Sequence, residues 1–332
     1  MNFIKKNYQG IVLSFFIALI ATFLGQCFSI IGGPVFGILV GLIIALFPRS
    51  SVFEPGIKFT SKKILQYAIV LLGFGMNLFQ IFAVGSQSLL IIISTISTAL
   101  IVTYFVSKWL KIPADVSILV GVGSSICGGS AIAATAPVIE AKDEDIAKSI
   151  SVIFLFNVIA AFLFPIFGEF LGLNDVGFGM WAGTAINDTS SVVAAGQTWA
   201  ASHSSDVALN YATIVKLTRT LAIIPITLIL AFYRSKKSNA VSVKLSQTFP
   251  WFILFFLLAA IFSTVFQLDT SVTTTLTDLS KFFITMAMSA IGLNTNIVQL
   301  VKSGGKPILL GFICWISIML VSLVMQQVLG IW

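Results

Sequence analysis

The sequence predicts an all-α, polytopic membrane protein that forms a single transmembrane domain over residues 1–332. Three observations support this fold class: 58% of the residues are hydrophobic, only 9% are charged, and the mean hydropathy is +1.04. Globular soluble domains contain about 25% charged residues, so this chain has too few charges to form a water-soluble surface.

Apolar runs of about 20 residues, the length needed to cross a bilayer, predict about nine full spans. They lie at 11–31, 33–48, 64–84, 88–107, 149–171, 210–233, 250–267, 279–297 and 307–329. Two further apolar segments, 116–139 and 177–200, are broken by glycine, serine and other polar residues. Each broken segment either crosses the membrane or enters it and returns to the same side.

Basic residues beside the spans predict their orientation, because cytoplasmic loops carry an excess of lysine and arginine. Lys5 and Lys6 place the N-terminus in the cytoplasm, and the basic loop at 49–63 returns to that side after the second span. The uncharged stretch GSQS at 85–88 then joins the third and fourth spans outside. Continuing this alternation to the end of the chain places the C-terminus outside.

Two local patterns predict how the helices pack and sit in the bilayer. Gly33, Gly37 and Gly41 are spaced four apart on one helix face, which favours close approach of a second helix. Trp181 and Trp199 bracket the second broken segment, and we expect them to be interfacial anchors and not groups that stack on the cargo.

Two pairs of similar segments indicate internal repetition. In the first pair, LLGFGMNLFQIFAVG at 71–85 resembles MSAIGLNTNIVQLVKSGG at 288–305. In the second pair, ICGGSAIAATA at 126–136 resembles INDTSSVVAAG at 186–196. Under the predicted orientation, the two members of the first pair run in opposite directions through the membrane.

This opposition is typical of transporters built from inverted repeats, in which broken helices meet near the bilayer midplane. The repeats would cover approximately 33–171 and 177–329, with the second one circularly permuted relative to the first. An inversion that also relates the two broken segments favours the re-entrant form of each.

The first broken segment, SSICGGSAIAATAPV at 124–138, predicts a half-helix that begins inside the membrane. Gly128 and Gly129 interrupt the helix, and Ser130 can cap the half-helix that resumes after them. Free backbone N–H groups at a helix start carry positive potential and form a ready anion site. The alternative is that glycine and serine here only allow tight helix packing.

Three charged residues lie in predicted membrane segments. Lys216 and Arg219 are three residues apart, and so on one helix face, and Asp188 lies in the second broken segment. Each unpaired charge near the bilayer centre costs ~2.5 to 3.5 kcal/mol on insertion scales. One arrangement pairs Asp188 with Lys216 and leaves Arg219 to hold an anionic ligand. In a second, Asp188 is a proton acceptor that drives transport, and in a third all three charges are structural.

The sequence argues against several classes of function. Basic residues gather beside the spans, so their partner is the lipid bilayer and not nucleic acid. Cys27, Cys127 and Cys314 show no CxxC spacing, so we expect neither a disulfide framework nor a metal site. There is no HExxH, P-loop or nucleotide fingerprint, and the sequence has one histidine. We therefore expect no catalytic residues, no cofactor and no enzyme.

Four stretches, SSICGGSAIAATAPVI, GTAINDTSSVVAAG, IVKLTRTL and MSAIGLNTNI, resemble the signature motifs of the YeiH family of bacterial inner-membrane proteins, described as sulfate exporters. The resemblance runs over about residues 12–330, and extends more distantly to the bile-acid and arsenite transporter superfamily. It implies a secondary transporter with crossed broken helices that exports sulfate or an organosulfur anion across the bacterial plasma membrane. Family members often carry His-Glu where this chain has Asn187-Asp188, which argues against proton coupling through an imidazole.

The motifs and the resemblance together assign candidate residues and partners. The expected substrate-binding residues are Ser125, Cys127, Gly128, Gly129, Ser130, Asn187, Thr189, Ser190, Arg219 and Asn294. Asp188 and Lys216 form the expected coupling or charge cluster. The expected partners are a small anion, H⁺ or Na⁺ as a coupling ion, and a second copy of the chain in a homodimer. The alternatives are an anion channel, and a membrane protein with a structural charge cluster and a non-anionic cargo.

Overall fold

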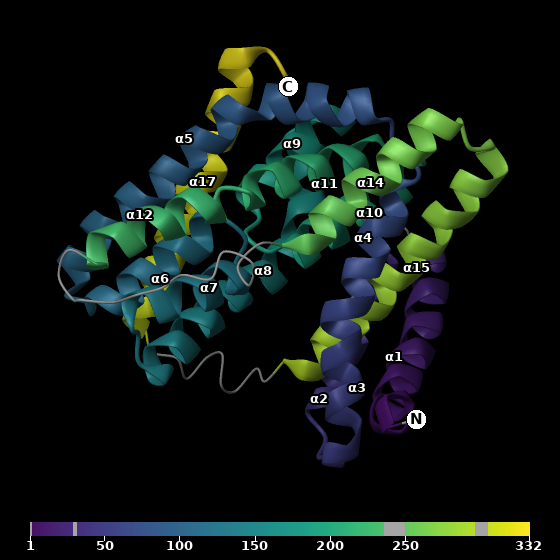
Figure 1. Ribbon diagram of the computed structural model, residues 1–332, viewed down its shortest axis with the longest axis horizontal. Helices are drawn as coiled ribbons and strands as arrows, with labels where there is room; N and C mark the ends of the chain where they lie inside the picture. Colours follow the sequence, from purple (N-terminus) through teal and green to yellow (C-terminus); the bar gives the residue numbers. More distant parts are fainter. Residues whose placement is uncertain (1, 29–31, 236–249, 296–304) are drawn as a thin grey trace.

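The computed structural model describes residues 2–28, 32–235, 250–295 and 305–332, and every regular element in these ranges is helical (Figure 1). The elements are α1 (Asn2–Cys27), α2 (Gly33–Ala45), η1 (Ser51–Phe53), α3 (Glu54–Phe59), η2 (Thr60–Ile64), α4 (Leu65–Gly73), α5 (Leu78–Leu110), α6 (Ala114–Ser125), α7 (Gly129–Ile139), α8 (Asp143–Phe170), α9 (Asp175–Ala185), α10 (Thr189–His203), α11 (Val207–Thr220), α12 (Ile223–Ser235), α14 (Trp251–Phe266), α15 (Thr270–Asn294) and α17 (Gly305–Leu329). Within the described ranges, 6 helices are long and apolar enough to cross a membrane. The predicted fold class, an all-α polytopic membrane protein, is confirmed, and the number of full spans stays a prediction.

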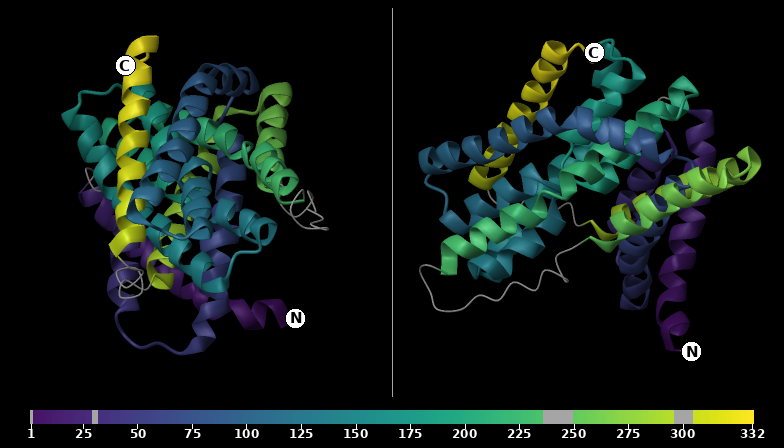
Figure 2. Two further views of the ribbon diagram at one scale, coloured as in Figure 1. Left: turned by 90° about the vertical axis from the view of Figure 1, so that its left-hand side faces the viewer. Right: turned by 45° about the horizontal axis from the view of Figure 1, so that its top comes forward.

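The helices form two bundles that lie side by side. The first bundle contains α1, α2, α3, η2, α4, α14 and α15, and the second contains α5 to α12 and α17. The right-hand view of Figure 2 shows the first bundle, with the purple α1 and the yellow-green α15, beside the teal helices of the second. The two broken segments, α6–α7 and α9–α10, both belong to the second bundle.

The first bundle is held together where α2 packs along α15, and glycines allow this close approach. A Cβ atom at Gly41 would lie 2.5 Å from the carbonyl oxygen of Ser289, and one at Gly37 would lie 2.8 Å from the hydroxyl of the same serine. Real Cβ atoms do not come this close to their neighbours, so larger residues would force the two helices apart. The predicted packing role of this glycine stripe is confirmed at both positions.

The expected hairpin through GSQS is wrong. Helix α4 ends at Gly73, the turn lies at 74–77, and the Asn77 side chain caps α5 by accepting from the N–H of Phe79 at 2.8 Å. The single helix α5 then runs for 33 residues through the GSQS stretch. Its serines do not break it, because Ser86 and Ser88 donate their hydroxyl hydrogens to carbonyls of the preceding turn.

The two tryptophans lie in the interior of the second bundle, so the interfacial placement expected for them is also wrong. Trp181 and Trp199 are each 1% exposed. Trp181 stacks on Phe164 and Trp199 stacks on Phe178, both with ring centroids 4.1 Å apart. The indole N–H of Trp181 donates to the buried carbonyl of Met319, and that of Trp199 donates to the half-buried carboxylate of Asp175. Burial is therefore possible without an unsatisfied donor.

Candidate substrate-binding site

The first break, between α6 and α7, depends on a glycine. Gly128 has φ +69° and ψ −132°, a conformation that side-chain-bearing residues rarely adopt. A Cβ atom there would also lie 3.3 Å from the Cβ of Asp188 and 3.4 Å from Nδ2 of Asn157. The chain therefore turns sharply at this residue, and it does so in contact with the second break.

The helix that follows begins without a side-chain cap. Gly128 occupies the N-cap position of α7 and provides no side-chain cap, and Ser130 is the second residue of the helix. The thiol of Cys127 accepts from the backbone N–H of Ala131, the third residue. The predicted cap by Ser130 is therefore wrong, because the helix begins at Gly129, two residues earlier than that cap requires. Within the described residues, the N–H groups of Gly129 and Ser130 have no hydrogen-bond acceptor.

The second break, between α9 and α10, is capped by Asp188. Its Oδ2 atom accepts from the backbone N–H of Ser190 at 3.0 Å and also from the hydroxyl of that serine. The N–H of Asp188 donates to Oδ1 of Asn157 on α8 at 3.1 Å. Aspartate is among the preferred residues at a helix start, since its carboxylate satisfies orphan N–H groups. Asn157 thus contacts both breaks.

Arg219 on α11 is fully buried, and its guanidinium group donates to the ends of two half-helices. At the end of α6, Nη2 donates to the carbonyl of Ser124 at 2.6 Å and Nε to that of Ser125 at 2.8 Å. At the end of α9, Nη1 donates to the carbonyls of Thr184 at 2.6 Å and Ile186 at 3.5 Å. The last carbonyls of a helix have no partner within it and carry negative potential, so one cation stabilises both ends.

Lys216 lies one helical turn before Arg219 on α11 and also binds backbone carbonyls of both breaks. It is fully buried, and its Nζ donates to the carbonyls of Ile126 at 2.7 Å and Ile186 at 3.0 Å, one from each break. No ion pair between Asp188 and Lys216 occurs in the part of the chain that the structure describes. The arrangement in which these two pair and Arg219 holds a ligand is therefore not observed. Both cations bind backbone carbonyls instead.

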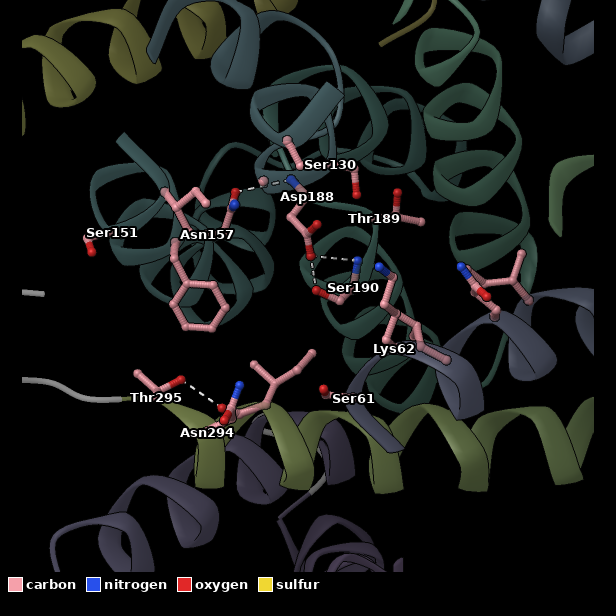
Figure 3. Close-up of a pocket in the computed structure, with 18 of the residues that line it drawn as sticks. Ser61, Lys62, Ser130, Ser151, Asn157, Asp188, Thr189, Ser190, Asn294 and Thr295 are labelled. Atoms are coloured by element: carbon pink, nitrogen blue, oxygen red, sulfur yellow. Dashed lines mark hydrogen bonds between the residues drawn. The ribbon is translucent and has the colours of Figure 1, made fainter. Parts of the chain in front are cut away.

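A cavity of 680 Å³ lies between the two bundles, next to the breaks (Figure 3). One wall comes from η2, α4, α14 and α15 of the first bundle, and the other from α7, α8 and α10 of the second. Its polar lining consists of Ser61, Lys62, Gln66, Ser130, Ser151, Asn157, Asp188, Thr189, Ser190, Asn294 and Thr295. Gly129 also lines it, and a Cβ atom there would meet nothing within 4 Å. The start of α7 is therefore open to the cavity.

Comparison with known proteins places the chain in a family. The sequence profile of a family described as Conserved hypothetical protein 698 matches residues 9–311. The chain belongs to this family, YeiH/UPF0324. A UPF0324 membrane protein of Streptococcus pyogenes serotype M18 is 59% identical over 98% of each chain. Others from Fusobacterium nucleatum and Streptococcus agalactiae serotype V are 54% and 53% identical, over at least 98% of each chain. The resemblance to the YeiH family is thus confirmed, and a bacterial membrane is the location of this UPF0324 protein.

In this UPF0324 chain the cavity brings together about half of the sequence-predicted site residues. Those on its walls are Gly129, Ser130, Asp188, Thr189, Ser190 and Asn294. The remaining candidates, behind the wall, are Ser125, Cys127, Gly128, Asn187, Lys216 and Arg219, and all of them are buried. Their assignment to substrate binding stays a prediction, and the geometry gives the two cations a different contact.

The sequence reasoning missed one polar side of the cavity. Ser61 and Lys62 were part of the predicted basic loop, but they lie on η2, a one-turn π-helix that often marks functional sites. Asn157 was also missed, although a single amide in the apolar run 149–171 was a readable signal, because a buried amide requires hydrogen-bond partners.

Proposed function

We propose that this protein is a secondary-active transporter that moves a small anion, such as sulfate or an organosulfur anion, by alternating access. The observation that carries the proposal is the start of α7, which opens without a cap into the cavity between the two bundles. In transporters with broken helices, half-helix N-termini inside the membrane point at anionic groups of the substrate. The cavity at α7 is the corresponding place in this chain.

The charges around the two breaks favour an anion at the start of α7. The negative ends of α6 and α9 are already satisfied by Arg219 and Lys216. The positive end of α10 is capped by Asp188, whereas the N–H groups at Gly129 and Ser130 remain free. An oxyanion in the cavity can accept hydrogen bonds from these two N–H groups and from the hydroxyl of Ser130.

The placement of the cavity supports alternating access. Its two walls belong to different bundles, so a rocking motion of one bundle against the other would open it to each side of the membrane in turn. Lys216 and Arg219 tie α6, α9 and α11 together at the breaks, which keeps the second-bundle wall in one piece during such a motion. In this proposal the two cations hold α6 and α9 against α11 and do not bind the substrate.

An anion at α7 lies near Asp188, and this requires a compensating positive charge. The carboxylate lines the same cavity, and like charges repel strongly where water is scarce. A proton or Na⁺ bound at Asp188 would neutralise it and would couple the anion to a cation gradient. Coupling by H⁺ or Na⁺ is therefore part of the proposed function, unless the substrate itself carries the positive charge.

A thermal-stability shift tests the proposal. The purified protein is unfolded in the presence of sulfate, sulfite, thiosulfate, isethionate and small carboxylates, with and without Na⁺ at two pH values. A ligand at 100 times its Kd adds ~2.7 kcal/mol of stability, which this assay detects. Gly129→Leu fills the cavity at a position with open space, so we expect it to fold and to lose the shift. No shift with any anion would overturn the proposal.

A further inference from the structure

We infer that the cavity takes a small organic zwitterion, a molecule with one acidic group and one ammonium group, and not a plain inorganic anion. This inference rests on the proposed function and names the substrate class of the same site. It starts from the charges that line the cavity. Of the described residues on its walls, only Lys62 and Asp188 are charged, and they have opposite signs.

The two charges lie on opposite walls. Lys62 belongs to η2 in the first bundle, and Asp188 caps α10 in the second. In Figure 3 the Lys62 side chain extends from its helix into the cavity, toward the wall that carries Ser190. Within the described residues Lys62 forms no ion pair, whereas Lys58 on the preceding turn pairs with Glu54 at 3.8 Å. Lys62 is therefore free to bind a ligand.

A plain anion fits this charge arrangement poorly. With Asp188 ionised, the side chains that line the cavity carry one positive and one negative charge, so their formal charges cancel. An ammonium group beside the Asp188 carboxylate would supply the positive charge that the anion needs. The acidic group of the same molecule would then lie between Lys62 and the free N–H groups of Gly129 and Ser130.

The size and apolar lining of the cavity also favour an organic molecule. Its volume of 680 Å³ falls in the range of about 300–1,000 Å³ typical of sites for organic ligands. The walls also carry apolar side chains, among them Leu65, Phe154, Phe252 and Ile291. These side chains would contact a short carbon spacer, which sulfate and sulfite lack.

Two matched pairs of probes test the inference: taurine against isethionate, and glycine against glycolate. Each pair keeps the acidic group and spacer and replaces the ammonium by a hydroxyl. Binding to the purified full chain is measured by titration calorimetry for the wild type, Asp188→Asn, Lys62→Gln and Lys63→Gln. Lys63 is the matched control, since it neighbours Lys62, is exposed, and does not line the cavity.

We expect the wild type and Lys63→Gln to bind at least one zwitterion about tenfold more tightly than its hydroxyl partner, because a charge-assisted hydrogen bond is lost with the ammonium. Asp188→Asn removes this preference, and Lys62→Gln weakens both members of the pair alike. Equal binding of the two members by the wild type would overturn the inference. A preference that survives Asp188→Asn would also overturn it. If the thermal-shift assay described above detects inorganic anions while calorimetry detects no zwitterion, the inference is refuted and the proposed function stands. If neither assay detects any binding, both are refuted.

Discussion

Arg219→Ala is expected to destabilise the protein strongly, because it removes the donor from two helix ends at once. Three of the four hydrogen bonds that Arg219 makes are 2.6 to 2.8 Å long, and all of them end on carbonyls in the interior. A buried acceptor left without a partner costs ~1–3 kcal/mol, although hydrogen bonds measured in membrane proteins average nearer ~0.6 kcal/mol. Losing three such bonds should therefore lower the free energy of unfolding by about 2 to 9 kcal/mol. We expect about 3 to 5 kcal/mol, the usual cost of removing one partner from a buried charged contact.

The assay is reversible unfolding in mixed micelles of increasing denaturing-detergent content, followed by tryptophan fluorescence. This signal reports on both bundles, since Trp181 and Trp199 are stacked within the second and Trp251 begins α14 in the first. Arg49→Ala is the matched control, because Arg49 makes one bond to a helix-end carbonyl, that of Leu293 at 2.5 Å. It should lose about a third as much free energy of unfolding as Arg219→Ala, or less. Equal losses in the two variants would refute the assignment of Arg219 as a brace for the two breaks.

Two further predictions concern glycines. Gly128→Ala should lower the free energy of unfolding by about 2 kcal/mol, because of its positive φ and the contact with Asp188, whereas Gly129→Ala should change it by less than about 0.5 kcal/mol. Chemical denaturation of the two variants side by side checks this, and similar losses would contradict the account of the break. Gly41→Val should cost about 1–3 kcal/mol, because its Cβ would collide with the backbone of α15 at Ser289. A wild-type unfolding curve for Gly41→Val would show that α2 and α15 do not pack as described.

The breaks could be predicted from the sequence because they follow from local chemistry. Paired glycines and an Asn-Asp pair inside apolar runs interrupt a helix wherever the chain goes next. The shared face of Lys216 and Arg219 followed from helical spacing alone. The sequence also showed that these charges need partners, since unpaired charges are costly in a membrane.

The identity of those partners could not be predicted. The sequence suggests side chains or a ligand as the partners of Arg219, whereas the structure supplies backbone carbonyls from the ends of α6 and α9. Which carbonyls lie within reach depends on how three helices cross, and no local pattern encodes that. The position of Lys62 could not be predicted for the same reason. A basic residue near a span indicates a cytoplasmic loop, and only the three-dimensional structure shows that η2 lies beside the cavity.

At the GSQS stretch, by contrast, a local sequence pattern predicted a chain reversal that the structure does not contain. The lack of charge at GSQS suggested an outside loop between two spans, but serine can bond to its own helix, and α5 runs for 33 residues through this stretch. The turn lies at 74–77 and ends at Asn77, whose side chain caps α5.

Counterflow in proteoliposomes tests the central claim, alternating access around the cavity at the breaks, most directly. Vesicles loaded with an unlabelled probe, in turn sulfate, thiosulfate and taurine, are placed in a low concentration of the same radiolabelled compound. We expect saturable uptake that the internal compound accelerates for at least one probe, in the wild type and in Gly129→Ala, and its loss in the cavity-filling Gly129→Leu. Uptake that rises linearly with concentration and is indifferent to the internal compound would indicate a channel and contradict the account.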